Sequence, residues 1–375
     1  MKKMFDIILN CSKIDILNCI DLDKINKNNE TLMIMLCKEK LGTIGLILLK
    51  NKYDENLKFN LEHQDNEKMT ALMYAIQNNL TKIAIIIISK MENINQKDEN
   101  GDTALLMAIK RENISVVKEL LKNKNIDINH ENIYKKTALM YAGSVDNIEI
   151  VKLILNRKDC NVMQKDINGD DVLSQNLINL NEKLLLEIAK KCNDFNHVYF
   201  NGNTLLIDSI HLHLLKLTEF IIKSNKCDLT FIDKTNKTAL IHAIEERFIK
   251  GALLLVDSKE NINCNHKDNM KNTALFYSAK YNLIEITNKL LQRNDCNVIG
   301  ENIYGYDFIG QLMIYKQENI IIKVLKQYEK ELKYKYDEIY CKAYCFGLEN
   351  IKKMLYKKIN LVNVNNFLLK YKSLI

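Results

Sequence analysis

Apolar residues recur along the chain in pairs of short runs with helical spacing, and residues 96–130 show the pattern clearly. The first run forms one apolar helix face from Leu105, Leu106, Ala108 and Ile109. The second run begins near Ile114 and forms such a face from Val116, Val117, Leu120 and Leu121. Polar Glu112-Asn113 separates the two runs, and Asn100-Gly101 before them predicts a tight turn with positive φ. The pattern therefore predicts a turn, a short helix, a loop, a longer helix and a return loop.

The same unit recurs along the chain at a nearly constant step, and each copy is marked by a Thr-Ala-Leu-like anchor whose Thr is placed to cap the first helix. Seven anchors begin at Thr31, Thr70, Thr103, Thr137, Thr204, Thr238 and Thr273. Two altered copies begin at Asp171 and Asp307. A fixed period of about 33 residues is typical of a stacked array, in which each unit buries its apolar face against its neighbours. We name each repeat by its anchor residue.

The anchors resemble ankyrin repeats over roughly residues 31–300: Thr-x-Leu-x-x-Ala is followed by Ile/Val-Val-Lys-x-Leu-Leu and Asp-Ile-Asn. The resemblance implies an all-α, ankyrin-type solenoid of stacked helix-turn-helix units joined by short β-turn fingers. The chain departs from the family because no anchor has Pro at the second place or His at the fourth. His242 stands at the fifth place instead. We therefore expect stability to depend on apolar stacking and Thr caps.

The chain divides by this pattern into three parts. Residues 1–30 read as a degenerate N-terminal capping unit, residues 31–322 as an array of about nine repeats, and residues 323–375 as a basic, Tyr-rich C-terminal capping region. Within the last part, residues 340–355 repeat the helix pattern once more. The longest step runs from Thr31 to Thr70, so the segment from Tyr53 to Phe59 reads as a loop insertion. The Asp171 repeat has lost its Thr, so we expect a weak joint there.

Composition adds little chemistry but narrows the class of protein. Hydrophobic residues make up 47% of the chain, which is ordinary for a folded protein. Its ten cysteines include no CxxC pair, and no apolar run approaches the ~20 residues of a membrane helix. We expect a soluble cytoplasmic protein with reduced thiols, acting in the host cytoplasm or nucleus. The abundance of Asn, Ile and Lys in ankyrin repeats resembles host-interaction proteins of large DNA viruses or AT-rich intracellular microbes.

Candidate metal ligands are better explained by the repeat. One histidine lies seven residues before every second anchor, too far from the next to share an ion: His63, His130, His197 and His266. His211 and His213 are predicted to point to different helix faces. We expect structural packing for Cys160, Cys227, Cys296, Cys341 and Cys345. The calcium-loop-like segments at 98–102 and 166–170 have Ile109 and Leu177 where such loops need Glu.

No catalytic motif occurs in the sequence, so we expect no enzyme, no cofactor and no metal. Residues 323–375 hold 12 Lys and 5 acidic residues, a net charge of +7, and seven of the 17 Tyr. Such a segment would suit nucleic acid or an acidic partner. The other interpretation is a solvated capping face, and we favour it because the acids interrupt the basic patch.

The ankyrin resemblance implies that a protein partner binds the concave surface, through the turn before each anchor Thr and the end of the first helix. In the Thr70 and Thr103 repeats these positions hold Asn66, Glu67, Met69, Gln77, Asn78, Glu99, Asn100, Asp102, Lys110 and Arg111. In the Thr137 repeat they hold Ile133, Tyr134, Lys136, Ser144 and Val145. In the Thr238 and Thr273 repeats they hold Lys234, Thr235, Lys237, Glu245, Glu246, Asn269, Met270, Asn272, Lys280 and Tyr281. Tyr134, Arg111, Tyr281 and Met270 are the main anchor candidates, because aromatic, Arg and Met side chains are enriched in interface cores.

We therefore expect a monomeric scaffold or adaptor that binds another protein, with no membrane association. The alternative is a factor associated with nucleic acid or an acidic partner through residues 323–375.

Overall fold

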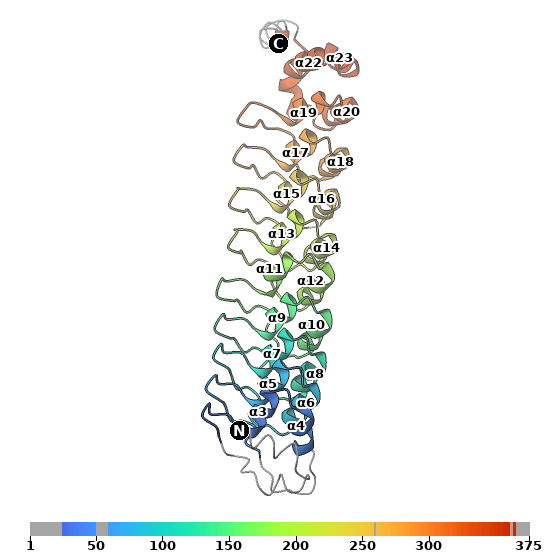
Figure 1. Ribbon diagram of the computed structural model, residues 1–375. Coiled ribbons are helices and arrows are strands. Elements are labelled where there is room, and N and C mark those ends of the chain that lie inside the picture. Colours follow the sequence, from blue (N-terminus) through green and yellow to red (C-terminus); the bar gives the residue numbers. More distant parts are fainter. Residues whose placement is uncertain (1–24, 50–58, 259, 361–362, 365–375) are drawn as a thin grey trace. The chain divides into compact units, whose positions relative to one another are not determined.

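The computed structural model describes residues 25–49, 59–258, 260–360 and 363–364. The chain forms two compact blocks, which we call the N-block (Met1–Cys192) and the C-block (Asn193–Ile375). Each block consists of successive helix pairs, and a finger-like loop precedes each repeat's first helix (Figure 1). The described residues contain no β-strand, only isolated bridges such as Lys97 with Thr103. The predicted fold class is confirmed.

In the N-block, the first helix of each pair packs on the first helix of the next, and the second helices do the same. The first, or inner, helices are α3 (Leu32–Lys38), α5 (Ala71–Gln77), α7 (Ala104–Lys110), α9 (Ala138–Ser144) and α11 (Val172–Leu177). The second, or outer, helices are α4 (Gly42–Leu49), α6 (Thr81–Ile88), α8 (Ile114–Lys122), α10 (Ile148–Leu155) and α12 (Glu182–Ala189). The predicted apolar faces are buried: Leu105, Ile109, Val116 and Leu120 are each at most 1% exposed.

The C-block repeats this arrangement. Its inner helices are α13 (Leu205–His211), α15 (Ala239–Glu245), α17 (Ala274–Lys280) and α19 (Phe308–Ile314). Its outer helices are α14 (Leu215–Lys223), α16 (Ile249–Val256), α18 (Ile284–Gln292) and α20 (Glu318–Gln327). After α21 (Glu329–Leu332) and the 3-10 turn η1 (Lys333–Lys335), α22 (Tyr336–Cys345) and α23 (Glu349–Leu355) form a further pair, followed by the turn η2 (Tyr356–Lys358).

The anchor residue begins each inner helix as its N-cap, as predicted. The Thr103 hydroxyl accepts a hydrogen bond from the Leu106 amide, and the Thr anchors of α3, α5, α9, α15 and α17 do the same for theirs. Asp171 and Asp307 take over this role in the altered repeats. Thr204 occupies the same position without a side-chain cap bond. Capping satisfies amide groups that have no partner within the helix.

Two backbone positions with positive φ recur in every repeat from Thr31 to Asp307. One lies two residues before the anchor and the other nine residues after it. Gly101 (φ 72°) and Glu112 (φ 52°) occupy them in the Thr103 repeat. The first position turns the finger, and the second turns the chain from the inner helix to the outer one. Only some repeats place glycine there, so the stack stabilises left-handed conformations that cost a side-chain-bearing residue about 1 kcal/mol or more.

The predicted capping and insertion segments lie partly outside the described residues. This applies to residues 1–24 of the N-terminal capping unit and to most of the insertion at 53–59. The Asp171 repeat forms both of its helices, and Asp171 accepts hydrogen bonds from the amides of Leu173 and Ser174. A weak joint at this repeat stays a prediction.

Candidate partner-binding surface

In each block, the fingers and the ends of the inner helices form one surface, which we call the finger face (Figure 1). An Asp or Asn five residues before the anchor builds most fingers. In the Thr70 repeat, Asp65 Oδ1 accepts the amides of Glu67 and Met69, both at 2.9 Å. Asp98 and Asp268 bind the equivalent amides of their own fingers. Asp98 and Asp166 are the first carboxylates of the calcium-like segments at 98–102 and 166–170, and both bind amides of their own turn, as the turn interpretation predicted.

A groove of about 530 Å³ lies on the finger face of the N-block, between the Thr70 and Thr103 repeats. Its lining residues are Glu67, Met69, Gln77, Asp98, Glu99, Asn100, Asp102, Met107, Lys110 and Arg111. All of these except Asp98 and Met107 belong to the predicted set of contact residues. The stacking of two repeats therefore brings predicted positions from separate parts of the sequence into one groove.

The groove carries an excess of negative charge. Its carboxylates are Glu67, Asp98, Glu99 and Asp102, and its cations are Lys110 and Arg111. Lys110 forms an ion pair with Asp102. Burial opposes the charge of Lys110, but the Asp102 carboxylate raises the pKa of Lys110 above its ordinary value. Glu67 lies 3.9 Å from the Lys38 ammonium, so Asp98 and Glu99 are the groove carboxylates that remain beside Arg111. This excess of negative charge suits a positively charged segment.

In the Thr103 repeat, Met107 stands at the anchor position where other repeats have a side chain that donates a hydrogen bond to the finger Asp. The Asp98 carboxylate in the groove therefore lacks that donor. At the fifth place of the anchor, the hydroxyls of Tyr74 and Tyr277 donate hydrogen bonds to Oδ2 of the finger Asp, the oxygen that does not bind the finger amides. His242 and Gln175 fulfil the same role in their repeats. Met107 has no such donor, and no other described residue hydrogen-bonds to Asp98 Oδ2. Asp98 is therefore half-buried at the groove with one carboxylate oxygen open to a ligand.

Most predicted contact residues are on the surface. The exposed ones are Asn66, Glu67, Gln77, Glu99, Asn100, Lys110, Arg111, Ile133, Tyr134, Ser144, Lys234, Thr235, Glu246, Asn269, Met270 and Lys280. The half-buried ones are Asn78, Lys136, Val145, Lys237, Glu245 and Tyr281. This distribution places the predicted set on the finger faces of both blocks. Whether these residues contact a partner stays a prediction.

Three predicted contact residues are buried, and this corrects the prediction that their side chains are available to a partner on the surface. Met69, Asp102 and Asn272 are 6%, 5% and 5% exposed, and each directly precedes its anchor Thr. Asp102 accepts a hydrogen bond from Asn132 of the next finger at 2.9 Å. Asn272 accepts one from Asn302 of the next finger at 3.0 Å. In the Thr103 and Thr273 repeats this position therefore joins neighbouring fingers, whereas Lys136 at the same position is half-buried.

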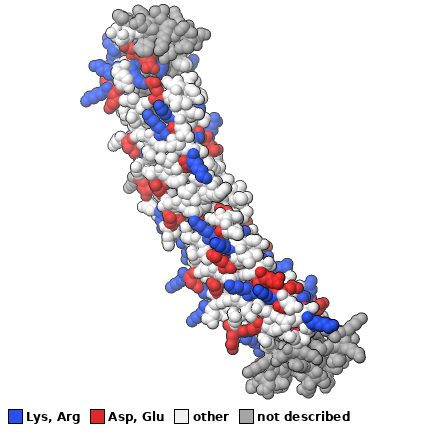
Figure 2. Space-filling view, turned by 90° about the vertical axis from the view of Figure 1, so that its left-hand side faces the viewer, with Lys and Arg blue, Asp and Glu red and all other residues white. Residues whose placement is uncertain are grey.

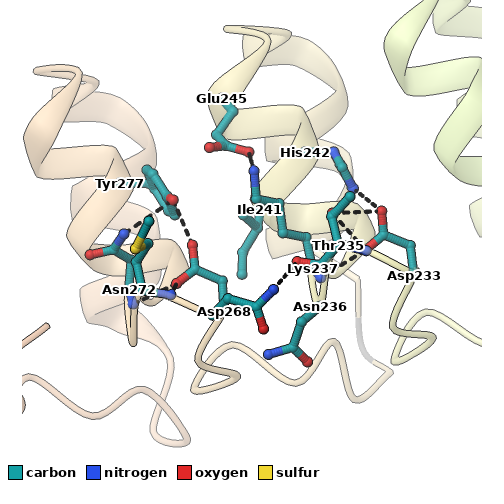
Figure 3. A network of polar contacts seen from close by, with 12 residues as sticks. Asp233, Thr235, Asn236, Lys237, Ile241, His242, Glu245, Asp268, Asn272 and Tyr277 are labelled. Atoms are coloured by element: carbon teal, nitrogen blue, oxygen red, sulfur yellow. Dashed lines mark hydrogen bonds and ion pairs between the residues drawn. The ribbon is translucent and has the colours of Figure 1, made fainter. Parts of the chain in front are cut away.

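A hydrogen-bond network within the C-block fingers was missed by sequence reasoning (Figure 3). Tyr277 Oη donates to Asp268 Oδ2 at 2.6 Å and accepts from Asn272 Nδ2 at 3.1 Å. His242 Nε2 bonds to Asp233 Oδ2 at 2.9 Å. The signal was present in the sequence, as an aromatic residue or His nine residues after the finger Asp. The expectation that stability depends on apolar stacking and Thr caps did not include this network.

The pKa values of Asp233 and His242, two members of this network, are shifted by burial and by neighbouring groups. Burial lowers the pKa of His242, although Asp233 opposes this, and nearby His211 and Lys237 lower it further. Burial favours protonation of Asp233, but hydrogen bonds from the Lys237 amide, Thr235 and His242 hold the pKa of that carboxyl below its usual value. His211 Nε2 lies 3.1 Å from His242 Nδ1, so His211 pairs with the next repeat. His213 instead stacks on Phe248, so the two point apart as predicted.

Three of the periodic histidines do more than occupy a turn. His130 Nε2 lies 2.7 Å from the carbonyl oxygen of Gly101, in the preceding finger. His63 and His266 make the equivalent contacts with the carbonyls of Asn29 and Asn236. The accepting residue in each case has positive φ, which turns its carbonyl toward the next finger. These histidines therefore join neighbouring fingers.

Part of the basic C-terminal region is paired with acidic residues where the structure describes it. Lys335 and Lys342 lie among the carboxylates of Glu301, Asp307 and Glu338, which they bind across the last repeat and α22. Lys352 and Lys358 pair with Glu349 and Glu329. On the finger side of the molecule, Lys and Arg alternate with Asp and Glu (Figure 2). These pairs favour the capping interpretation of this region.

No helix among the described residues has the length and apolar character needed to cross a membrane.

The family model described as ankyrin repeats in three copies matches residues 86–166 and 214–302. Among solved structures, the ankyrin repeat domain of Bcl-3, described as a unique member of the IkappaB protein family, is similar at 18% identity and a TM-score of 0.49. The match covers 61% of this chain and 99% of that domain. No curated protein matches the chain. The family match identifies the repeats within residues 86–166 and 214–302 as ankyrin repeats, and the other described repeats have the same helix pairs and fingers.

Proposed function

We propose that the chain is a non-enzymatic scaffold or adaptor that binds a protein partner on its finger face. The observation that carries the proposal is the N-block groove, which gathers predicted contact residues from two repeats. Ankyrin repeats are typically binding scaffolds, and stacked repeats create extended surfaces without reaction chemistry. The polar, open groove suits a segment of another protein.

The charge of the groove makes the proposal more specific. Among the described residues of the groove, Asp98 and Glu99 have no ion-pair partner, and Arg111 is the one cation without a carboxylate partner. The partner segment we propose is therefore basic, with Lys or Arg side chains reaching the open oxygen of Asp98. A role as a host-interaction adaptor in the cytoplasm or nucleus is the further form of this proposal, and it is supported only by the Asn-, Ile- and Lys-rich composition of the repeats.

The experiment compares proteins captured from a lysate of the native host by three forms of the full chain. The first is the wild type, and the second carries Glu67→Lys and Glu99→Lys, which reverse the groove's charge. The third carries Glu285→Lys, the same change on the exposed surface of an outer helix. We expect a set of basic-segment proteins that binds the wild type and the Glu285 variant but not the groove variant. Capture that the groove variant leaves unchanged would contradict the proposal.

A further inference from the structure

Two cysteines from successive repeats meet in the C-block, outside the finger face. Cys264 lies in the loop before the Thr273 finger, and Cys296 lies in the next loop, after α18. Their loops are hydrogen-bonded: Asn265 Nδ2 donates to the Asp295 carbonyl, and the Asn297 amide donates to Asn265 Oδ1 at 2.7 Å. The Cys264 thiol also donates to the Asp295 carbonyl, at 3.4 Å. This register places the Cys264 thiol at the carbonyl of the residue that directly precedes Cys296, so the two cysteines are neighbours across the joint.

A fixed cation lies beside this pair. The Arg293 guanidinium interacts with Cys264. Arg293 is held by the carbonyls of Val256 and Ser258, at 3.0 and 3.1 Å, and by the Asp295 carboxylate. The hydrogen bond from Cys296, aided by Arg293, lowers the pKa of Cys264 despite burial, and raises the pKa of Cys296. A neighbouring cation is a feature that lowers the pKa of a cysteine thiol.

The N-block contains the same joint without the second thiol. Arg157 and Asp159 pair as Arg293 and Asp295 do, and Cys160 follows them. Asn129 makes both loop contacts, to the Asp159 carbonyl and the Asn161 amide. The residue in the place of Cys264 is Ile128. Burial there raises the pKa of Cys160 to about 11. Cys160 takes the place of Cys296, and the pKa of both thiols is raised. The thiol with the lowered pKa is Cys264, which has no counterpart in the N-block joint.

We propose that Cys264 and Cys296 form a redox-active pair, which a peroxide oxidises to a disulfide that links two successive repeats. The Cys264 thiolate attacks one peroxide oxygen, which forms a sulfenic acid and releases one water. The Cys296 sulfur then attacks the sulfenic sulfur, and the hydroxyl leaves as a second water. Two thiols and one hydrogen peroxide thus give one disulfide and two waters. The two side chains are 2% and 5% exposed, so a small oxidant is favoured over a bulky disulfide reagent.

The test treats the full-length chain with hydrogen peroxide at neutral pH, blocks remaining thiols by alkylation, and maps peptides by mass spectrometry without reductant. We expect a cross-linked peptide joining residues 264 and 296, lighter than the reduced pair by two hydrogen atoms and separated again by dithiothreitol. Oxidation of Cys160 should be slower, because its smaller thiolate fraction is only partly offset by higher nucleophilicity. The change Cys160→Ser should leave the cross-link unchanged.

Two variants separate the proposed pair from general oxidation. Cys264→Ile copies the N-block joint, so it should fold and leave Cys296 as a thiol. Cys296→Ser should stop the reaction at a Cys264 sulfenic acid, which dimedone traps. Failure to find the 264–296 peptide under conditions that oxidise Cys160 would overturn the proposal. So would a 264–296 peptide that forms no faster than Cys160 is oxidised. Neither result depends on partner binding.

Discussion

Tyr277→Phe removes one hydroxyl and tests whether the hydrogen bond from the fifth anchor residue to the finger Asp stabilises the fingers. Tyr277 is 4% exposed, and its hydroxyl is the donor to Asp268 Oδ2 at 2.6 Å. A hydrogen bond to a charged group contributes about 1.5–3 kcal/mol. Asp268 Oδ1 keeps its two backbone donors, so the carboxylate is not left without partners. We therefore expect the free energy of unfolding of the C-block to fall by about 2 kcal/mol.

The measurement is urea unfolding followed by circular dichroism, with hydrogen exchange of the α17 amides to localise the loss, since repeat arrays need not unfold in one step. Tyr281→Phe is the matched control because no described residue hydrogen-bonds to its hydroxyl. Tyr74→Phe should repeat the Tyr277 result in the N-block, where that hydroxyl donates to Asp65 at 2.8 Å. If Tyr277→Phe cost no more than Tyr281→Phe, the network would not be a stabilising feature.

Three further sets of substitutions test the buried histidine, the Thr caps and the glycines with positive φ. Burial lowers the pKa of His242 in the folded chain below 6.5, so the unfolded chain binds more protons between that pKa and 6.5. The free energy of unfolding of the C-block, measured in urea, should therefore fall as the pH drops through 6.5 toward the folded-state pKa. His242→Gln should flatten this dependence on pH, and an unchanged slope would refute the role of His242. Thr273→Ala should cost about 1 kcal/mol and Thr204→Ala less, because only Thr273 makes a cap bond; equal losses in thermal unfolding would argue against the caps. Gly101→Ala should cost more than the roughly 1–2 kcal/mol expected for Gly169→Ala. Both glycines have positive φ, but a Cβ on Gly101 would lie 3.2 Å from the Ile133 amide nitrogen whereas Gly169 faces open space, so the reverse order in urea unfolding would contradict this account.

The sequence predicts the repeat well because its strongest signals are local. The Thr103 cap, the Gly101 turn and the break at Glu112-Asn113 each depend on a few neighbouring residues, and all three are confirmed. The burial of Leu105 and Val116 also follows from spacing alone. Such features repeat with the period, so each copy reinforces the others.

Features that join one repeat to the next are harder to predict. Asp102 bonds to Asn132 only because the two fingers stack, and an isolated repeat gives no sign of this. The groove depends in the same way on the register of two repeats. Cys264 and Cys296 belong to successive loops, and a one-residue difference in loop register would separate them. The sequence shows which residues each repeat offers, whereas stacking decides which of them meet.

Spin-label distances along the outer helices test the stacking of repeats most directly. Lys82, Ser115, Glu149 and Lys183 are exposed, lie on α6, α8, α10 and α12, and occupy the same place relative to their anchors. A stack with ~8–10 Å between packed helices predicts label distances from residue 82 that increase in equal steps to about 24–30 Å at residue 183. Distances that fail to increase along this series, or that are shorter for residue 183 than for residue 149, would contradict the stacked-repeat account.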